Sequence, residues 1–420
     1  MLAFRATQSQ RRPCVRASDQ LKHTLAILHA VAQVGRSHPS KPALQSISPL
    51  SNYFDKSGRV IVRDLDIRDG GVTRREALLR MLLLSAVIDQ GPDIEGVRRL
   101  ATDVLNDLYA REVRILHRPL DFFEHFHISA SSIEDCHAVV KAARAQTWAE
   151  RNDSNPAKYL LYMEGAGQTL GYAIYRWGAP LMVPLMLAQE AAERGEESAD
   201  ALYRHLRAKH NGFAHSVEGV TSLIKDHGRY GLGKAIGDKA AHLFGKWVVH
   251  SFPLLSSPGN DAWGPWSYEV PFDSNAGRVL YRTGIVTGWV DDARLKKHEV
   301  IQPGRGKGGK TAHMRVTNLR GVESTLAQDS QVLVDANRRL CVDHLRSHKR
   351  APQKVQAQHI PSSIALLDGT MTPGEIDDGL IRVGTEWCFN TAIPRCNACP
   401  LKSVCAGANE QPELIANVRT

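Results

Sequence analysis

Four cysteines near the C-terminal end constrain this chain more than any other feature. They follow the spacing C-x7-C-x2-C-x5-C and are four of the seven cysteines in 420 residues: Cys388, Cys396, Cys399 and Cys405. A Cys-x-x-Cys pair readily binds one metal centre, and two further thiolates nearby complete an all-sulfur ligand set. Zinc modules usually carry two short-spaced pairs, whereas this run carries one, so the spacing favours a [4Fe–4S] cluster. Zinc, disulfides and unligated redox or structural thiols are the alternatives.

Upstream of the cysteines, the dominant pattern is helical. Apolar residues recur with helical spacing in segments 21–34, 73–88, 94–110, 133–149, 159–177, 180–192, 199–209 and 216–226. Thr73 and Glu76 are expected to form a capping box at the start of the second segment. No segment alternates polar and apolar residues for long enough to predict a sheet. We therefore predict an all-α fold, and this length is sufficient for two packed units.

The net charge of the protein indicates what kind of partner it binds. The formal net charge of +9 favours a polyanion such as DNA. No apolar run reaches the ~18 residues that a membrane-spanning helix requires, so no membrane partner is expected. Because no secretory signal is recognisable, we expect a cytoplasmic protein, and we expect it to be a monomer.

A glycine-containing turn between two apolar segments offers an anion site. The segment 230–241 reads YGLGKAIGDKAA, and backbone N–H groups at such a turn, together with the following helix N-terminus, favour a phosphate. The residues expected to bind DNA there are Gly233, Lys234, Ile236 and Gly237. Lys239 has two interpretations: a nucleophile, which requires a lowered pKa, or a simple phosphate contact.

Asp273 lies in the segment 270–284, directly before a predicted helix. A carboxylate there can stabilise a nearby positive charge, or it can accept a proton. The structural alternative is an N-cap for the helix that follows.

Two further segments suggest nucleic-acid contacts. Trp263, Trp266 and Tyr268 could stack on an extruded base, or form a small aromatic core under a loop. The tract 305–310, with Arg305, Lys307 and Lys310, suits phosphate binding or a solvated connector.

Three of these stretches, in this order, resemble the helix–hairpin–helix DNA glycosylases of the endonuclease III and MutY type. Segment 236–241 resembles the V-G-x-K-x-A hairpin, with Ala235 in place of the usual first glycine, and segment 270–284 resembles VDTHxxR…R, including Arg278 and Arg282. The cysteine run resembles C-x6-C-x2-C-x5-C, with its first gap one residue longer. Segment 81–86 is similar to the family's LLSAQ helix, but Val87 replaces the glutamine, and Gln90 is the nearby substitute.

The resemblance implies a two-domain helix–hairpin–helix DNA glycosylase fold with a C-terminal [4Fe–4S] cluster loop. The expected divisions are an N-terminal extension with one helix and a linker (1–72), a helical barrel ending in the hairpin (73–250), and an aromatic insertion, catalytic helix and cluster domain (251–420). The N-terminal helix is expected to join the last of these. The resemblance also implies catalysis by Asp273 and Lys239 and a DNA contact from Arg278.

The implied function is excision of a modified, bulky pyrimidine from DNA, with base flipping, in DNA repair or phage defence. Lyase activity would follow from a Schiff base on Lys239. The insertions are similar to those of the α-glutamyl/putrescinyl thymine pyrophosphorylase-like branch, which gives a base-modifying transferase as the first alternative. The second alternative is a non-catalytic DNA-binding protein with a structural cluster.

Overall fold

The computed structural model describes residues 17–88, 94–125, 127, 132–150, 167–208, 220, 223–225, 227–232, 236, 238–255, 270–271, 274–285, 304–305, 312–313, 370–389, 394–412 and 415. Its α-helices are α1 (Ala17–Ser37), α2 (Arg74–Ile88), α3 (Ile94–Ala110), α4 (Leu120–His125), α5 (Ile133–Glu150), α6 (Gly167–Glu193), α7 (Ala201–Arg207), α9 (Asp238–Lys246), α10 (Ser274–Arg282), α16 (Pro373–Glu386) and α17 (Ala406–Asn409). Short helical turns are η1 (Leu44–Ser46), η2 (Ser48–Tyr53), η3 (Val62–Asp64), the π-helical η5 (Trp247–Ser251), η8 (Cys396–Ala398) and η9 (Lys402–Val404).

Strands in the described residues are confined to two short antiparallel ladders: β1 (Arg68–Asp69) with β2 (Val72–Thr73), and β3 (Gly304–Arg305) with β4 (Ala312–His313). The prediction of a helical protein is therefore confirmed. None of the described helices is both long enough and apolar enough to cross a membrane.

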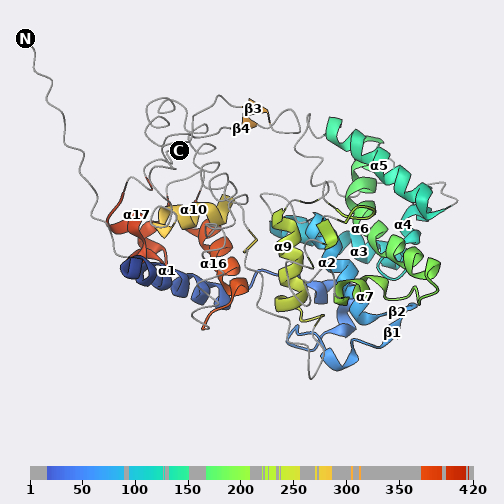
Figure 1. Cartoon of the computed structure of the whole chain (residues 1–420), viewed down its shortest axis with the longest axis horizontal. Helices are drawn as coiled ribbons and strands as arrows, with labels where there is room; N and C mark the ends of the chain where they lie inside the picture. Colours follow the sequence, from blue (N-terminus) through green and yellow to red (C-terminus); the bar gives the residue numbers. More distant parts are fainter. Residues whose placement is uncertain are drawn as a thin grey trace, which may run out of the picture.

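The helices gather into two groups, each with its own apolar core (Figure 1). The larger core runs from Leu44 to Leu255 and is centred on α2, which packs against α6, α7 and α9. Residues 44–72, expected to belong to an N-terminal extension, contribute Leu50 and Tyr53 to this core instead. The chain therefore enters the larger unit about thirty residues earlier than the periodicity of α2 indicated.

The smaller core joins the two ends of the chain. Helix α1 packs along α16, and α10 also packs on α16, so residues near positions 30, 280 and 380 form one cluster. The α1–α16 crossing brings the two backbones into direct contact. A Cβ on Gly35 would overlap the carbonyl oxygen of Glu375, and one on Gly379 would overlap that of Val31. Glycine at these two positions therefore permits the crossing.

Two sequence expectations about helix ends are wrong, for tertiary reasons. Segments 159–177 and 180–192 were expected to be separate, but residues 167–193 form the single helix α6, with Pro180 and Pro184 inside it. Neighbouring α2 and α5 pack on this helix, and that packing offsets the hydrogen bonds that the prolines remove.

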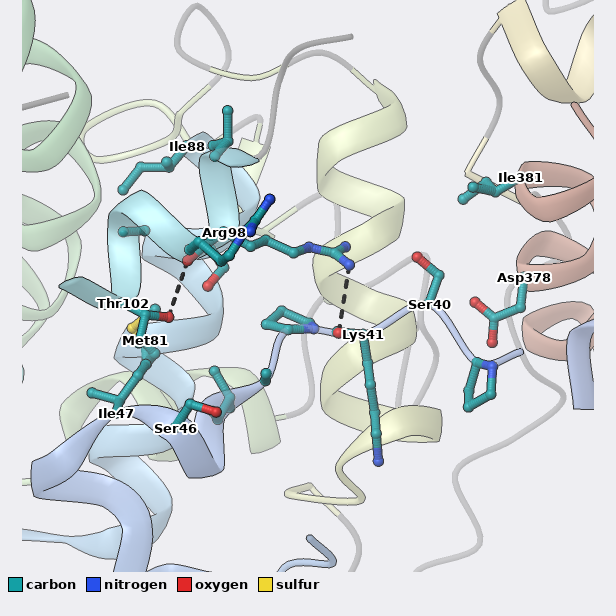
Figure 2. A pocket seen from close by; sticks show the side chains of 18 of the residues that line it. Ser40, Lys41, Ser46, Ile47, Met81, Ile88, Arg98, Thr102, Asp378 and Ile381 are labelled. Carbon is teal, nitrogen blue, oxygen red and sulfur yellow. Dashed lines mark hydrogen bonds between the residues drawn. The ribbon is translucent and has the colours of Figure 1, made fainter. Parts of the chain in front are cut away.

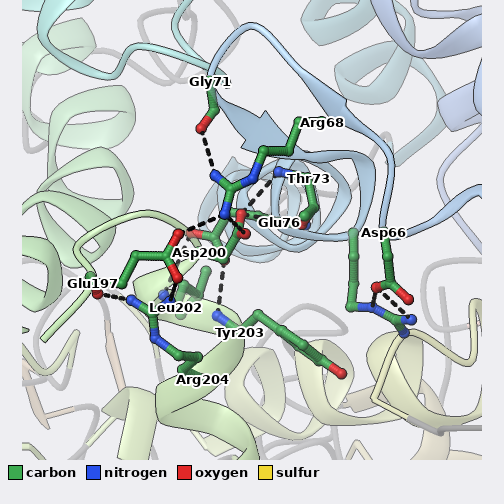
Figure 3. A network of polar contacts seen from close by, with 11 residues as sticks. Asp66, Arg68, Gly71, Thr73, Glu76, Glu197, Asp200, Leu202, Tyr203 and Arg204 are labelled. Carbon is green, nitrogen blue, oxygen red and sulfur yellow. Dashed lines mark hydrogen bonds and ion pairs between the residues drawn. The ribbon is translucent and has the colours of Figure 1, made fainter.

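The expected capping box at α2 is only half formed. Glu76 N donates to Thr73 Oγ1 (3.2 Å), but the fully buried Glu76 carboxylate turns to another helix and accepts from the backbone N–H groups of Leu202 and Tyr203 (Figure 3). It thereby caps α7, whose own N-cap residue, Asp200, accepts from Thr73. Arg80 Nε neutralises Glu76 at 2.9 Å. This exchange of caps ties the start of α2 to the start of α7.

Candidate functional site

The four cysteines of the C-terminal run line one small pocket. The loop that carries them is closed by a backbone hydrogen bond from Arg395 N to Trp387 O (2.8 Å), which joins the residue before Cys396 to the residue before Cys388. This closure explains how a gap of seven residues can still bring Cys388 and Cys396 to the same pocket. Cys396 and Cys399 are joined by a single helical turn, in which Cys399 N donates to Cys396 O (3.2 Å).

A buried arginine faces these thiols. Arg282 is 1% exposed, and its Nη1 donates to the Sγ atom of Cys388 (3.2 Å) and to the carbonyl oxygen of Phe389 (2.8 Å). Its Nε and Nη2 atoms have no hydrogen-bond partner among the described residues. A buried guanidinium without a carboxylate beside it is costly. A negatively charged set of thiolates would offset that cost.

The four cysteine thiols suit a metal centre that prefers soft sulfur ligands. Burial raises the pKa of Cys396 and Cys405, and it raises the pKa of Cys399 to about 11. These three shifts favour the protonated thiols of Cys396, Cys399 and Cys405, so metal binding there would release protons. In the described part of the chain, no group of three or more His, Cys, Asp and Glu side chains is already placed to hold a metal ion, so the thiols share a pocket rather than a finished coordination geometry.

Arg278, which was expected to contact DNA, makes hydrogen bonds inside the protein. Arg278 is 4% exposed, and its guanidinium donates to the carbonyl oxygens of Cys388 (2.6 Å) and Gly384 (2.7 Å) and to Asn275 Oδ1 (2.7 Å). These bonds fasten α10 to the end of α16 and to the first cysteine. The guanidinium is therefore occupied by contacts inside the protein.

A second ionic cluster connects the two units. Lys246, the last residue of α9, donates from Nζ to Asp377 Oδ2 (2.7 Å) and to Asp378 Oδ1, both on α16. All three side chains are at most 5% exposed. Burial lowers the pKa of Lys246, but the two carboxylates raise it more, so the pKa lies above its usual range. Burial raises the pKa of Asp378, against the opposing effect of Lys246.

Between the two units lies a cleft of about 900 Å³, within the usual size range of ligand sites. Its walls come from α2 and α3 on one side, from α16 on the other, and from residues 38–47 (Figure 2). Figure 2 shows Arg98 of α3 reaching toward the segment that carries Lys41 and Ser40, with Asp378 and Ile381 of α16 on the other side of that segment. We refer to this space as the interdomain cleft.

The described part of the hairpin contains two of the predicted site residues, Ile236 and Lys239. Ile236 is 3% exposed, and its backbone N–H donates to Leu232 O (2.9 Å), so it is a core residue whose amide is already used. Lys239 is half-buried near the start of α9, the helix whose other end pairs with α16. Arg305 lies in strand β3.

Most of the remaining predicted residues lie outside the part of the chain that the structure describes. They are Gln90, Gly233, Lys234, Gly237, Trp263, Trp266, Tyr268, Asp273, Lys307 and Lys310. Helix α10 begins at Ser274, immediately after Asp273, and its Asn275 packs against Gly384 of α16. Gly384 precedes Thr385, which lines the interdomain cleft.

Several residues of this region were missed by the sequence analysis. Lys246 interrupts an apolar segment, and Asp377 and Asp378 form an acidic pair inside a segment with apolar periodicity, so each was visible as a charge at a predicted buried position. Arg98 carried no such signal, because it looks like any solvated arginine on a helix. Comparison with known proteins finds no matching family model, no matching curated protein and no matching solved structure.

Proposed function

We propose that this chain is a DNA glycosylase with a helix–hairpin–helix fold, in which the four cysteines hold a structural [4Fe–4S] cluster. The proposal rests on one observation above all. The three stretches that resemble the family are far apart in sequence, yet elements belonging to or adjoining them make direct contacts with α16 or with Cys388 just after it, and α16 lines the interdomain cleft.

Those contacts follow a continuous path. Lys246 connects α9 to α16, Arg278 connects α10 to the end of α16 and to Cys388, and Arg282 connects α10 to the Cys388 thiol. Helix α9 carries Lys239, α10 begins directly after Asp273, and both helices meet α16. Such convergence at the junction of two units is typical of a catalytic site.

In this proposal Cys388, Cys396, Cys399 and Cys405 are the cluster ligands, and Arg282 supplies a compensating positive charge. A cluster bound there cross-links residues 388–405 and so stabilises the smaller unit. In this proposal, side chains of the protein rather than the cluster carry out the reaction. Asp273 would stabilise positive charge at C1′ as the N-glycosidic bond breaks, and water would complete the hydrolysis.

The decisive test uses purified full-length protein and DNA that contains modified pyrimidines. We expect abasic sites with the wild type and with the control Asp107→Asn, an exposed carboxylate on α3, and none with Asp273→Asn. Wild-type protein that leaves every modified DNA intact, or equal activity in Asp273→Asn, refutes the proposal. Covalent change on the base without any abasic site supports the transferase alternative instead.

The role of Lys239 is tested separately by borohydride trapping. A Schiff base predicts a protein–DNA cross-link that disappears in Lys239→Gln and persists in Lys56→Gln, a matched exposed lysine. Active enzyme without a cross-link identifies a monofunctional mechanism. Iron and acid-labile sulfide in equal amounts, both lost when the cysteines become serine, support the cluster, whereas bound zinc contradicts it.

A further inference from the structure

A histidine that has no part in the proposed reaction is buried in the larger unit. His117 is 8% exposed, and each of its ring nitrogens contacts a tyrosine hydroxyl. Nε2 lies 3.1 Å from the Oη atom of Tyr53, the last residue of η2, and Nδ1 lies 2.7 Å from the Oη atom of Tyr109, near the end of α3. The imidazole therefore bridges two elements that are separate in the chain.

The donors and acceptors around His117 determine its protonation state. Tyr53 donates its only hydroxyl proton to Asp69 Oδ2 at 2.9 Å, so its oxygen must accept from His117 Nε2–H. Tyr109 Oη accepts from the backbone N–H of Leu116 at 3.1 Å, and its own proton is available for His117 Nδ1. This chain of hydrogen bonds, which we call the His117 network, is complete when the ring is neutral and carries its proton on Nε2.

A second proton on the ring has no acceptor in this arrangement. Protonated Nδ1 would face the hydroxyl proton of Tyr109, so Tyr109 would have to turn its O–H bond away from His117. The network thus distinguishes the neutral ring from the charged one by geometry alone.

Charged side chains face the network from several elements: Asp69 of β1, Arg74 and Arg80 of α2, Arg114 of the segment between α3 and α4, and Asp121 of α4. Burial has the largest influence on His117 and lowers its pKa. Asp69 raises that pKa, whereas Arg80 and Arg114 lower it further, and the net shift is downward. The ring is therefore neutral at neutral pH.

The same network fastens one wall of the interdomain cleft. The segment that leads into η2 and the first half of α3 both line that cleft. Behind the wall they are joined by the His117 network and by Asn106 of α3, whose Oδ1 accepts from Ser48 N at 2.8 Å and whose Nδ2 donates to Ser46 O at 3.4 Å. His117 and Tyr109 also line a cavity of about 390 Å³, through which a proton from solvent can reach the ring.

We propose that His117 is a pH-sensitive latch, which holds η2 against α3 while its ring is neutral and releases them in mild acid. The proton binds Nδ1, Tyr109 turns its hydroxyl toward the cavity, and the new charge is better solvated once the two elements separate. Because the closed arrangement lowers the pKa of His117, closure is complete above the ordinary imidazole value and weakens as the pH falls below it. The latch acts on the cleft wall and does not depend on the proposed reaction.

Hydrogen–deuterium exchange of the full-length protein, followed by mass spectrometry, tests the latch. His117→Gln keeps one donor and one acceptor in the side chain but does not titrate. Wild type and variant are compared at about pH 7.5 and about pH 5.5, on either side of the ordinary imidazole pKa. Between these values we expect the ratio of wild-type to variant exchange rates to rise about three- to tenfold in residues 44–53 and 105–117.

Controls show whether the effect is specific and local. His127→Gln, a change at an exposed histidine, is the matched control and should exchange as wild type does at both pH values. Peptides from α1 and α16, in the smaller unit, should show no change in the ratio. Thermal melting at neutral pH establishes that each variant retains the fold. Deuterium exchange at the C2 carbon of the histidine rings of wild type needs no variant, and His117 should titrate at a lower pH than His127.

An equal pH dependence of exchange in wild type and His117→Gln overturns the proposal. A rise that extends through α6 to the same degree also overturns it, because the larger unit would then be unfolding as a whole. So does a His117 ring that titrates at or above the pH at which His127 titrates. Each of these outcomes is independent of the abasic-site assay with Asp273→Asn, so failure of the latch and failure of the proposed function are distinguishable.

Discussion

Replacing Lys246 with methionine should strongly destabilise the protein. The change removes a cation that bridges two almost completely buried carboxylates, with side-chain exposures of 0% for Asp377 and 5% for Asp378. Methionine fills similar volume, so the cost is mainly electrostatic. Removing one partner of a buried ion pair typically costs about 3–5 kcal/mol, because the remaining charge is left unpaired in a poorly solvated site. Total stabilities are only about 5–15 kcal/mol, so the effect is large.

Urea unfolding, followed by tryptophan fluorescence and far-ultraviolet circular dichroism, measures this change. The triple variant Lys246→Met with Asp377→Asn and Asp378→Asn removes all the charges and should recover most of the loss. Arg194→Met, which breaks an exposed ion pair with Glu196, is the control and should leave the unfolding midpoint unchanged. A loss below about 1 kcal/mol in Lys246→Met would contradict the reasoning, because it would mean that water reaches the cluster.

The same cluster predicts the direction in which stability changes with pH. Folding raises the pKa of Lys246, so its contribution to stability is complete at pH values below the pKa of the unfolded chain. That contribution is lost as the pH rises through the pKa of the folded protein, in the alkaline range. The pKa of Asp378 is also raised, so folding favours its neutral form, and stability falls as pH rises from the ordinary carboxyl range through the folded value. Asp378→Asn should therefore be tolerated at neutral pH. Urea unfolding of the wild type and of this variant at a series of pH values measures the difference in their stability.

Three further changes test other parts of the fold. Gly379→Ala forces a Cβ into the Val31 carbonyl and should cost about 1–3 kcal/mol in urea unfolding; a neutral result would contradict the close crossing of α1 and α16. His117→Phe leaves two tyrosine hydroxyls, which contact its ring nitrogens at 3.1 and 2.7 Å, without that partner, and should cost about 1–3 kcal/mol by the same measurement. Arg282→Met should lower the iron retained by purified protein without changing its helix content, and unchanged iron would show that the Cys388 contact is dispensable.

The sequence by itself determined the helical class and much of the helix register. The segment predicted at 94–110 has the bounds of α3, and the segments at 73–88 and 133–149 differ from α2 and α5 by one residue each. Periodicity succeeds there because an amphipathic helix records in its own sequence which face is buried. The cysteine spacing was equally local, since its ligand candidates lie within 18 residues and one closing hydrogen bond brings them to a common pocket.

Tertiary structure decided what the charged residues do. Arg278 and Arg282 occupy the same predicted helix and look alike in sequence, yet one binds backbone carbonyls and the other faces a thiol. Glu76 was expected to cap its own helix and caps α7 instead, because a segment more than 120 residues away supplies unpaired N–H groups beside it. Lys246 acquires its role only when α9 and α16 meet. Hydrogen bonds and ion pairs depend on partners brought by the fold, and local periodicity carries no record of those partners.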